Sequence, residues 1–171
     1  MKKKLITIVT ALVCLLACVF GFAACGMTEG LQYKKVDGGY VVSYYNGART
    51  GADGYITVEI PSEYKELPVI GIEKEAFRGC AGISEIKLPD TIETIGDHAF
   101  ERTSLTGIRL PASVTSIGVS VFLQCPGAKD AADGKWYFKV TFEGTQEQWD
   151  AVTKADGWKT NSATVSVTCL G

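Results

Sequence analysis

Two stretches of the sequence, Ile86–Phe100 (IKLPDTIETIGDHAF) and Ile108–Phe122 (IRLPASVTSIGVSVF), are copies of one pattern. The proline, the glycine and the final phenylalanine each recur at a spacing of 22 residues. A fixed period of this length indicates a solenoid, in which each repeat forms one coil. Three separate landmarks at one spacing argue against unrelated hairpins with chance similarity.

An earlier copy of the pattern begins at Val58-Glu59-Ile60-Pro61, resumes at Val69–Ile72 and ends in Ala76-Phe77. It carries five extra residues between the proline and Val69, and one more after Phe77. These extra residues account for the spacing of 28 from Pro61 to Pro89.

Each copy starts with alternating apolar residues, which predicts a short strand with one buried face. The proline then removes a ladder donor and ends the strand. The isoleucine and the Ala-Phe step further along turn inward again. One coil cannot cover these residues alone, so stacking is expected to bury them, with the repeat phenylalanines in a single column: Phe77, Phe100 and Phe122.

These residues resemble the BspA-type leucine-rich repeats, whose pattern is a strand ending in Ile/Leu-Pro, a Val-x-x-Ile-Gly step and an Ala-Phe-x-x-Cys turn. The departures are Glu73 for the glycine in the first copy, Thr103 for the cysteine in the second and Val121 for the alanine in the third. Val140–Trp149 resembles the closing segment of that family. The resemblance implies an α/β repeat solenoid of mostly short strands with helical turns, capped at both ends.

Both ends of the repeat carry signals for caps. Asp37-Gly38 separates two apolar stretches and predicts a hairpin, and Thr145 with Gln148 predicts a capped helix that presses Trp149 onto the last coil. Trp136, Phe138, Val140 and Phe142 are expected to face inward from one terminal strand. The predicted organisation is a signal peptide (1–24), a short tether (25–30), an N-terminal cap hairpin (31–57), the repeats (58–128) and a C-terminal cap (129–171).

The first 22 residues have three lysines followed by an uncharged apolar run, which is typical of a signal peptide. Ala23-Ala24-Cys25-Gly26 resembles a lipobox, in which the cysteine is acylated and the peptide bond before it is cut. Cys18 is a rival position, and an uncleaved membrane anchor is the other alternative. Cys25 is preferred because polar sequence begins directly after it.

Removal of 24 residues from the 171 leaves 147, enough for one domain, with 14 basic and 19 acidic residues. This acidic balance, without a basic cluster, argues against nucleic acid as a partner. The membrane is expected to be reached through the lipid alone. The odd number of remaining cysteines, Cys80, Cys125 and Cys169, leaves at least one thiol unpaired unless it bridges two chains.

A catalytic constellation is not expected. His98 is the sole histidine and occupies a variable repeat position, which predicts an ordinary surface residue. Cys80 and Cys125 each follow the repeat phenylalanine by three residues, so they are expected to pack in the core two coils apart, too far for a disulfide. No acidic pair has a metal-ligand spacing, and neither a metal nor a cofactor is predicted.

The outward positions of the predicted strands form two rows that offer a platform for a ligand. Either they bind a partner or they are ordinary solvated strand residues, with Glu59 and Lys87 simply paired across the ladder. The rows are Thr57, Glu85, Gly107, Lys139 and Glu59, Lys87, Arg109, Thr141.

The family resemblance implies a non-catalytic adhesion or binding module at the cell surface, held to the membrane by its lipid on the extracytoplasmic side. Its partners would be extracellular proteins or glycans. The alternative is an accessory lipoprotein subunit of an enzyme or transporter complex in the cell envelope.

Intact-mass analysis of protein extracted from membranes tests the leader. We expect a chain that lacks its first 24 residues and carries added acyl mass on Cys25, because the small residues before this cysteine end the apolar run. A chain that still begins at Met1, or a soluble chain cut elsewhere, contradicts the prediction.

Overall fold

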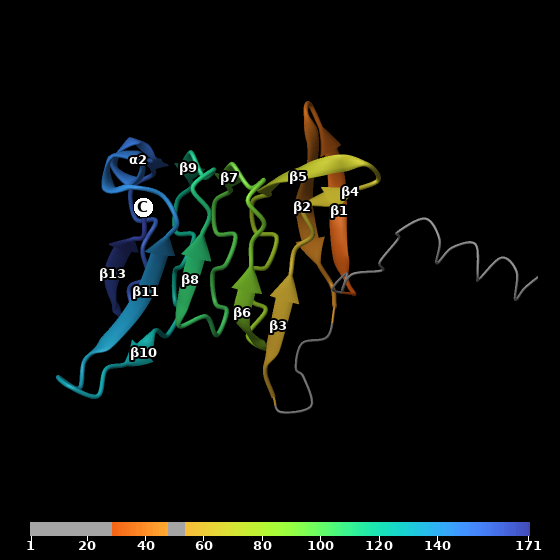
Figure 1. Cartoon of the computed structure of the whole chain (residues 1–171). Helices are drawn as coiled ribbons and strands as arrows, with labels where there is room; N and C mark the ends of the chain where they lie inside the picture. The colour runs from red at the N-terminus through yellow and green to blue at the C-terminus, as the bar shows by residue number, and fades with distance from the viewer. Residues whose placement is uncertain (1–28, 48–53) are drawn as a thin grey trace, which may run out of the picture.

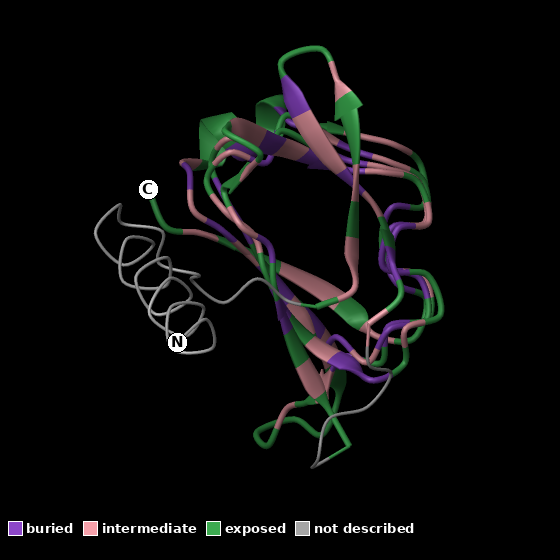
Figure 2. Cartoon of the chain, turned by 90° about the vertical axis from the view of Figure 1, so that its right-hand side faces the viewer, coloured by how far each residue is buried: buried purple, intermediate pink, exposed green. Residues whose placement is uncertain are grey.

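The computed structural model describes residues 29–47 and 54–171, which form one right-to-left stack of coils in Figure 1. The predicted signal peptide and its cysteines, Cys18 and Cys25, lie outside the described residues. Viewed along the stack, the chain has a three-sided outline (Figure 2). Two sides are made of strands and the third of turns.

The first side, called here the strand face, starts each coil, as the alternation of apolar residues predicts. Its strands run parallel where they pair, β3 with β6, and β8 with β11 and then β13. Their bounds are β3 Ile56–Glu59, β6 Ile83–Lys87, β8 Gly107–Leu110, β11 Trp136–Phe142 and β13 Thr164–Cys169.

The second side is a longer sheet in the order β1-β2-β5-β7-β9-β12. Equivalent repeat residues pair between coils in this sheet, for example Ile72 with Ile95 and Ile95 with Ile117. Its strands are β1 Leu31–Val36, β2 Gly39–Tyr45, β5 Leu67–Ile72, β7 Thr94–Ile95, β9 Ser116–Ile117 and β12 Thr153–Lys154.

Glycine at the corner after this sheet lets neighbouring coils touch backbone to backbone. A Cβ on Gly96 would lie 2.6 Å from the amide nitrogen of Lys74, and one on Gly118 would lie 2.6 Å from that of Asp97. The five-residue insertion of the first copy is accommodated by β4 Glu63–Tyr64, which pairs antiparallel with β5.

The prediction of helical turns, and with it the α/β class, is wrong: the third side is built of turns that bond from coil to coil. Along this side the amides alternate between a bond within the turn and a bond to the next coil, as in Phe77 to Ala99 and Phe100 to Val121. A residue with positive φ opens the turn in each copy and interrupts any helix: Glu75 (φ 60°), His98 (φ 56°) and Ser120 (φ 53°). Among the described residues the one α-helix is α2 Gln146–Ala151, in the C-terminal cap.

The predicted phenylalanine column is confirmed. The ring centroids of Phe77 and Phe100 are 5.5 Å apart, those of Phe100 and Phe122 are 5.8 Å apart, and all three rings are fully buried. Tyr45 of the N-terminal hairpin continues the column at one end and Phe138 of β11 continues it at the other. The column therefore runs from cap to cap.

The N-terminal end carries the expected hairpin, in which β1 and β2 pair antiparallel around Asp37-Gly38. Gly38 has φ 87°, a backbone conformation that favours glycine in such a turn. The hairpin joins the second sheet through β2 and β5, so it continues the stack of coils.

The C-terminal end has the predicted capping box, since the Thr145 side chain accepts from the Gln148 amide and the Gln148 side chain accepts from the Thr145 amide. Trp149 is 6% exposed and packs on Phe142 and Trp158.

One inward position of β11 was wrongly predicted. Trp136 is 50% exposed, because here β11 pairs with β10 Ala128–Lys129 in a hairpin that projects below the coils (Figure 1). Phe138, Val140 and Phe142 are buried as expected.

Replacing Phe100 by alanine is expected to destabilise the fold by about 3–5 kcal/mol, because the ring is fully buried between two others. Chemical denaturation measures this loss. A change below about 1 kcal/mol would mean that the column does not carry the core.

Candidate functional site

The strand face holds the residues that the sequence offered as a ligand platform. Thr57 pairs with Glu85 and Glu59 with Lys87 on β3 and β6, while Lys139 pairs with Gly107 and Thr141 with Arg109 on β8 and β11. The side chains follow this pairing: the Thr57 hydroxyl donates to Glu85 at 3.0 Å, and Lys87 Nζ lies 3.9 Å from Glu59 Oε2.

The two rows are not continuous, contrary to the prediction that each runs across four strands. In the described chain no ladder pair joins β6 to β8, so the strand face is divided between them. On the other side of β8 the approach is close: a Cβ on Gly107 would be only 2.5 Å from the carbonyl oxygen of Lys139. Glycine at this position therefore lets β8 lie directly against β11.

A groove of about 530 Å³ lies over this division. It gathers six of the eight residues of the predicted rows, whereas Thr57 lies outside it and Glu59 lines a neighbouring groove of about 320 Å³ that shares Lys87 with it. The six residues are Glu85, Lys87, Gly107, Arg109, Lys139 and Thr141.

Two acidic residues of the groove were missed by the sequence reasoning. Asp90 follows the proline after β6, and Glu143 follows β11, so both lie where strands end. Their position directly after predicted parallel strands was a usable signal, because the carboxyl ends of such strands share one edge. Glu143 forms an ion pair with Arg109.

The groove thus carries three acidic and three basic side chains, of which some are already paired. Arg109 and Lys87 have acidic partners, whereas Asp90, Glu85 and Lys139 have no ion pair within the part of the chain that the structure describes. Such groups can pair with a ligand of either sign without first breaking an existing ion pair.

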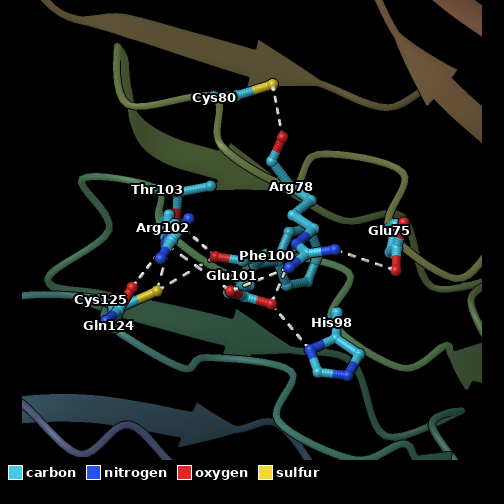
Figure 3. Close-up of polar contacts among 10 residues, drawn as sticks. All are labelled: Glu75, Arg78, Cys80, His98, Phe100, Glu101, Arg102, Thr103, Gln124 and Cys125. Carbon is cyan, nitrogen blue, oxygen red and sulfur yellow. Dashed lines mark hydrogen bonds and ion pairs between the residues drawn. The ribbon is translucent and has the colours of Figure 1, made fainter.

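A second polar cluster, on the turn side, centres on a carboxylate that the sequence did not single out. The Glu101 side chain is only 5% exposed. Its oxygens lie 3.1 Å from Arg78 Nε, 2.7 Å from His98 Nδ1 and 3.7 Å from Arg102 Nε (Figure 3). Arg78 and Glu101 occupy the same repeat position one coil apart with opposite charges, which was the signal that could have revealed the pair.

His98 is therefore not the plain surface residue that was predicted. Its side chain is 30% exposed, and the ring N–H at Nδ1 donates to Glu101. The reason is the turn from His98 to Glu101, in which the Glu101 amide donates to the His98 carbonyl at 3.2 Å and the two side chains come together.

The two cysteines of the turn side differ in burial, and Cys125 does not have the environment of an activated nucleophile. Cys125 is buried, as predicted, and burial raises the pKa of its thiol, which also contacts the Thr103 hydroxyl at 3.3 Å. Cys80 is only partly buried, and its sulfur lies 4.0 Å from the Arg78 carbonyl. Within residues 29–47 and 54–171, Cys125 and Cys169 are free thiols.

Within residues 29–47 and 54–171, no group of three or more His, Cys, Asp or Glu side chains is arranged to hold a metal ion. The same residues include no helix of the length and hydropathy needed to cross a membrane.

Comparison with known families identifies the family of the repeat. The model described as "BspA type Leucine rich repeat region" matches residues 55–132, in six copies. Residues 55–132 are a BspA-type leucine-rich repeat region. The matched segment contains β3, β6 and β8 and ends before β11, so it includes the groove residues from Glu85 to Arg109 but not Lys139, Thr141 and Glu143.

Among solved structures, the chain is similar to a leucine-rich repeat protein of T. pallidum, with 23% identity and a TM-score of 0.46. The likeness covers 82% of this chain and 63% of that one, so this chain spans less than two thirds of its length. No curated protein is similar enough to count as a relative.

Replacing Glu101 by glutamine is expected to lower the free energy of unfolding by about 1–3 kcal/mol, because Arg78 and His98 then lose a charged acceptor inside the turn side. Glu75→Gln is the matched control. Glu75 also pairs with Arg78, at 3.2 Å, but is 42% exposed, so its loss should cost less than about 1 kcal/mol. Equal losses for the two variants, measured by chemical denaturation, would contradict a special role for the buried carboxylate.

Proposed function

We propose that this leucine-rich repeat protein is a non-catalytic binding module whose groove between β6 and β8 holds an extracellular protein. The observation that carries the proposal is the groove itself, in which Asp90, Glu85 and Lys139, without ion pairs among the described residues, lie beside Arg109 and Lys87. A surface with both signs of charge suits a protein partner, which itself presents acidic and basic side chains.

The rigidity of the site favours binding. The groove residues stand on strands and strand ends whose opposite face is locked in the core, as with Ile108 and Leu110 of β8, which are 6% and 0% exposed. Binding therefore costs little backbone entropy, which raises the affinity that a small contact area can reach.

We further propose that a lipid on Cys25 holds the module on the outer side of the membrane. Each buried methylene of an acyl chain contributes about 0.8 kcal/mol to anchoring. Many copies on one membrane would then bind together and compensate for a weak single contact.

A charge-matched pair of triple variants tests the groove. The full chain is first used to capture and identify an extracellular protein, and its affinity is then measured for each variant. Lys87→Ala, Arg109→Ala and Lys139→Ala together should weaken binding at least tenfold, since about 1.4 kcal/mol suffices for that factor.

Lys35→Ala, Lys65→Ala and Lys159→Ala form the control, because they remove the same charge from exposed positions outside the groove. Its affinity should stay within about twofold of the original chain. If both triple variants lose affinity equally, the net charge of the chain and not the groove determines binding. If neither variant loses affinity, the binding site lies elsewhere. If the chain instead captures a glycan, or an enzyme or transporter of the cell envelope, the proposal of an extracellular protein as the partner is wrong.

A further inference from the structure

The last strand of the strand face, β13, has an open edge. It pairs in parallel with β11 over its whole length, from Tyr137 with Thr164 to Phe142 with Cys169. Within the described residues no strand pairs with its other side. In Figure 1 it lies at the end of the stack opposite to the N-terminal hairpin. The backbone groups along this edge are thus available to another strand.

The inward side of β13 is also incompletely covered. Val165 and Val167 pair with Phe138 and Val140, so they point to the core side of the sheet. Among residues 29–47 and 54–171 no coil packs beyond them, and Val167 is 37% exposed. Leu170, directly after the strand, is 54% exposed. The edge therefore combines free backbone groups with exposed apolar side chains.

The strands at the opposite end carry charges that oppose self-pairing. Lys34 and Lys35 lie on β1, and Glu59 lies on β3, whereas β13 has no charged residue from Thr164 to Cys169. Charged side chains on edge strands are a common protection against unwanted strand pairing. Protection at one end alone favours an association that uses the unprotected end.

We propose that β13 pairs antiparallel with β13 of a second copy of this chain, so that two solenoids join end to end. Opposite residues in an antiparallel pair lie on the same face of the sheet. A two-fold axis at Val167 satisfies this condition: Val167 meets Val167 of the second copy, and Val165 meets its Cys169. A two-fold axis at Ser166 satisfies it as well, with Val165 meeting Val167 of the second copy.

Both registers place apolar residues beside apolar residues and hydroxyls beside hydroxyls. The interface is isologous, because the same strand is used twice, and it closes at two copies. The protected strands at the other ends then keep the pair from growing into a filament.

Light scattering on the detergent-solubilised full chain, over a series of protein concentrations, tests the association. The protein mass, corrected for detergent, should approach twice that of one chain. Val167→Lys should raise the dissociation constant at least tenfold, because the two-fold axis brings the new charges together.

Val119→Lys is the control, since Val119 is a valine of similar exposure, 41%, on the turn side. It should leave the dimer unchanged. A single-chain mass for the original protein at every concentration, or an equal effect of both variants, overturns the proposal.

Disulfide trapping gives a second readout that needs no destabilising charge. In a Cys169→Ser background, Val167→Cys or Ser166→Cys should yield a covalent dimer under mild oxidation, depending on which residue lies on the two-fold axis. Val119→Cys in the same background should not. A doubled mass without trapping at either position would mean that the chains associate through another surface, and the proposal would be wrong.

Discussion

The structure depends on one constraint: each coil must bury its inward side chains against the next, because no coil can cover them alone. The 22-residue period brings Phe100 and Phe122 of the two regular copies into one column at 5.8 Å, and Phe77 of the earlier copy joins it at 5.5 Å from Phe100. Backbone bonds between coils on the strand sides and on the turn side keep the column in register. Tyr45 and Phe138 extend it into the caps, so that the ends are stabilised by the same packing as the repeats.

The same stacking of coils arranges the exposed side chains in rows. Positions at which the copies differ interrupt these rows and produce the groove and the polar cluster on the turn side. Gly107 allows β8 to approach β11 closely, whereas in the described residues no ladder pair joins β8 to β6, and a groove lies over this division. On the turn side, Arg78 and Glu101 occupy one repeat position on adjacent coils and form a partly buried ion pair. A repeat protein thus acquires individual sites through single positions at which the copies differ.

The two ends of the solenoid differ in the way they meet solvent. The N-terminal hairpin continues the second sheet with a strand that bears Lys34 and Lys35. At the C-terminal end, Trp149 and Trp158 cover part of the core, while β13 leaves an uncharged edge. Closing a solenoid requires both a cover for the core and protection of the strand edges, and only the first is provided at this end by the described residues.

The sequence by itself determined the features that depend on period and on local chemistry. The coils, the phenylalanine column, the hairpin at Asp37-Gly38 and the capping box at Thr145 were all predictable, because regular spacing and short-range hydrogen bonds leave few alternatives. The outward residues of the strands were also predictable, because strand side chains alternate between two faces.

The tertiary structure decided what depends on the distance between coils. The turns proved to be non-helical, since positive φ at residues such as His98 allows the amides to bond from coil to coil. The groove, the burial of Glu101 and the pairing of β13 with β11 likewise arise between segments distant in the sequence. Periodicity says which residues share a side of the coil, but only the packed backbone decides where neighbouring coils touch and where they part.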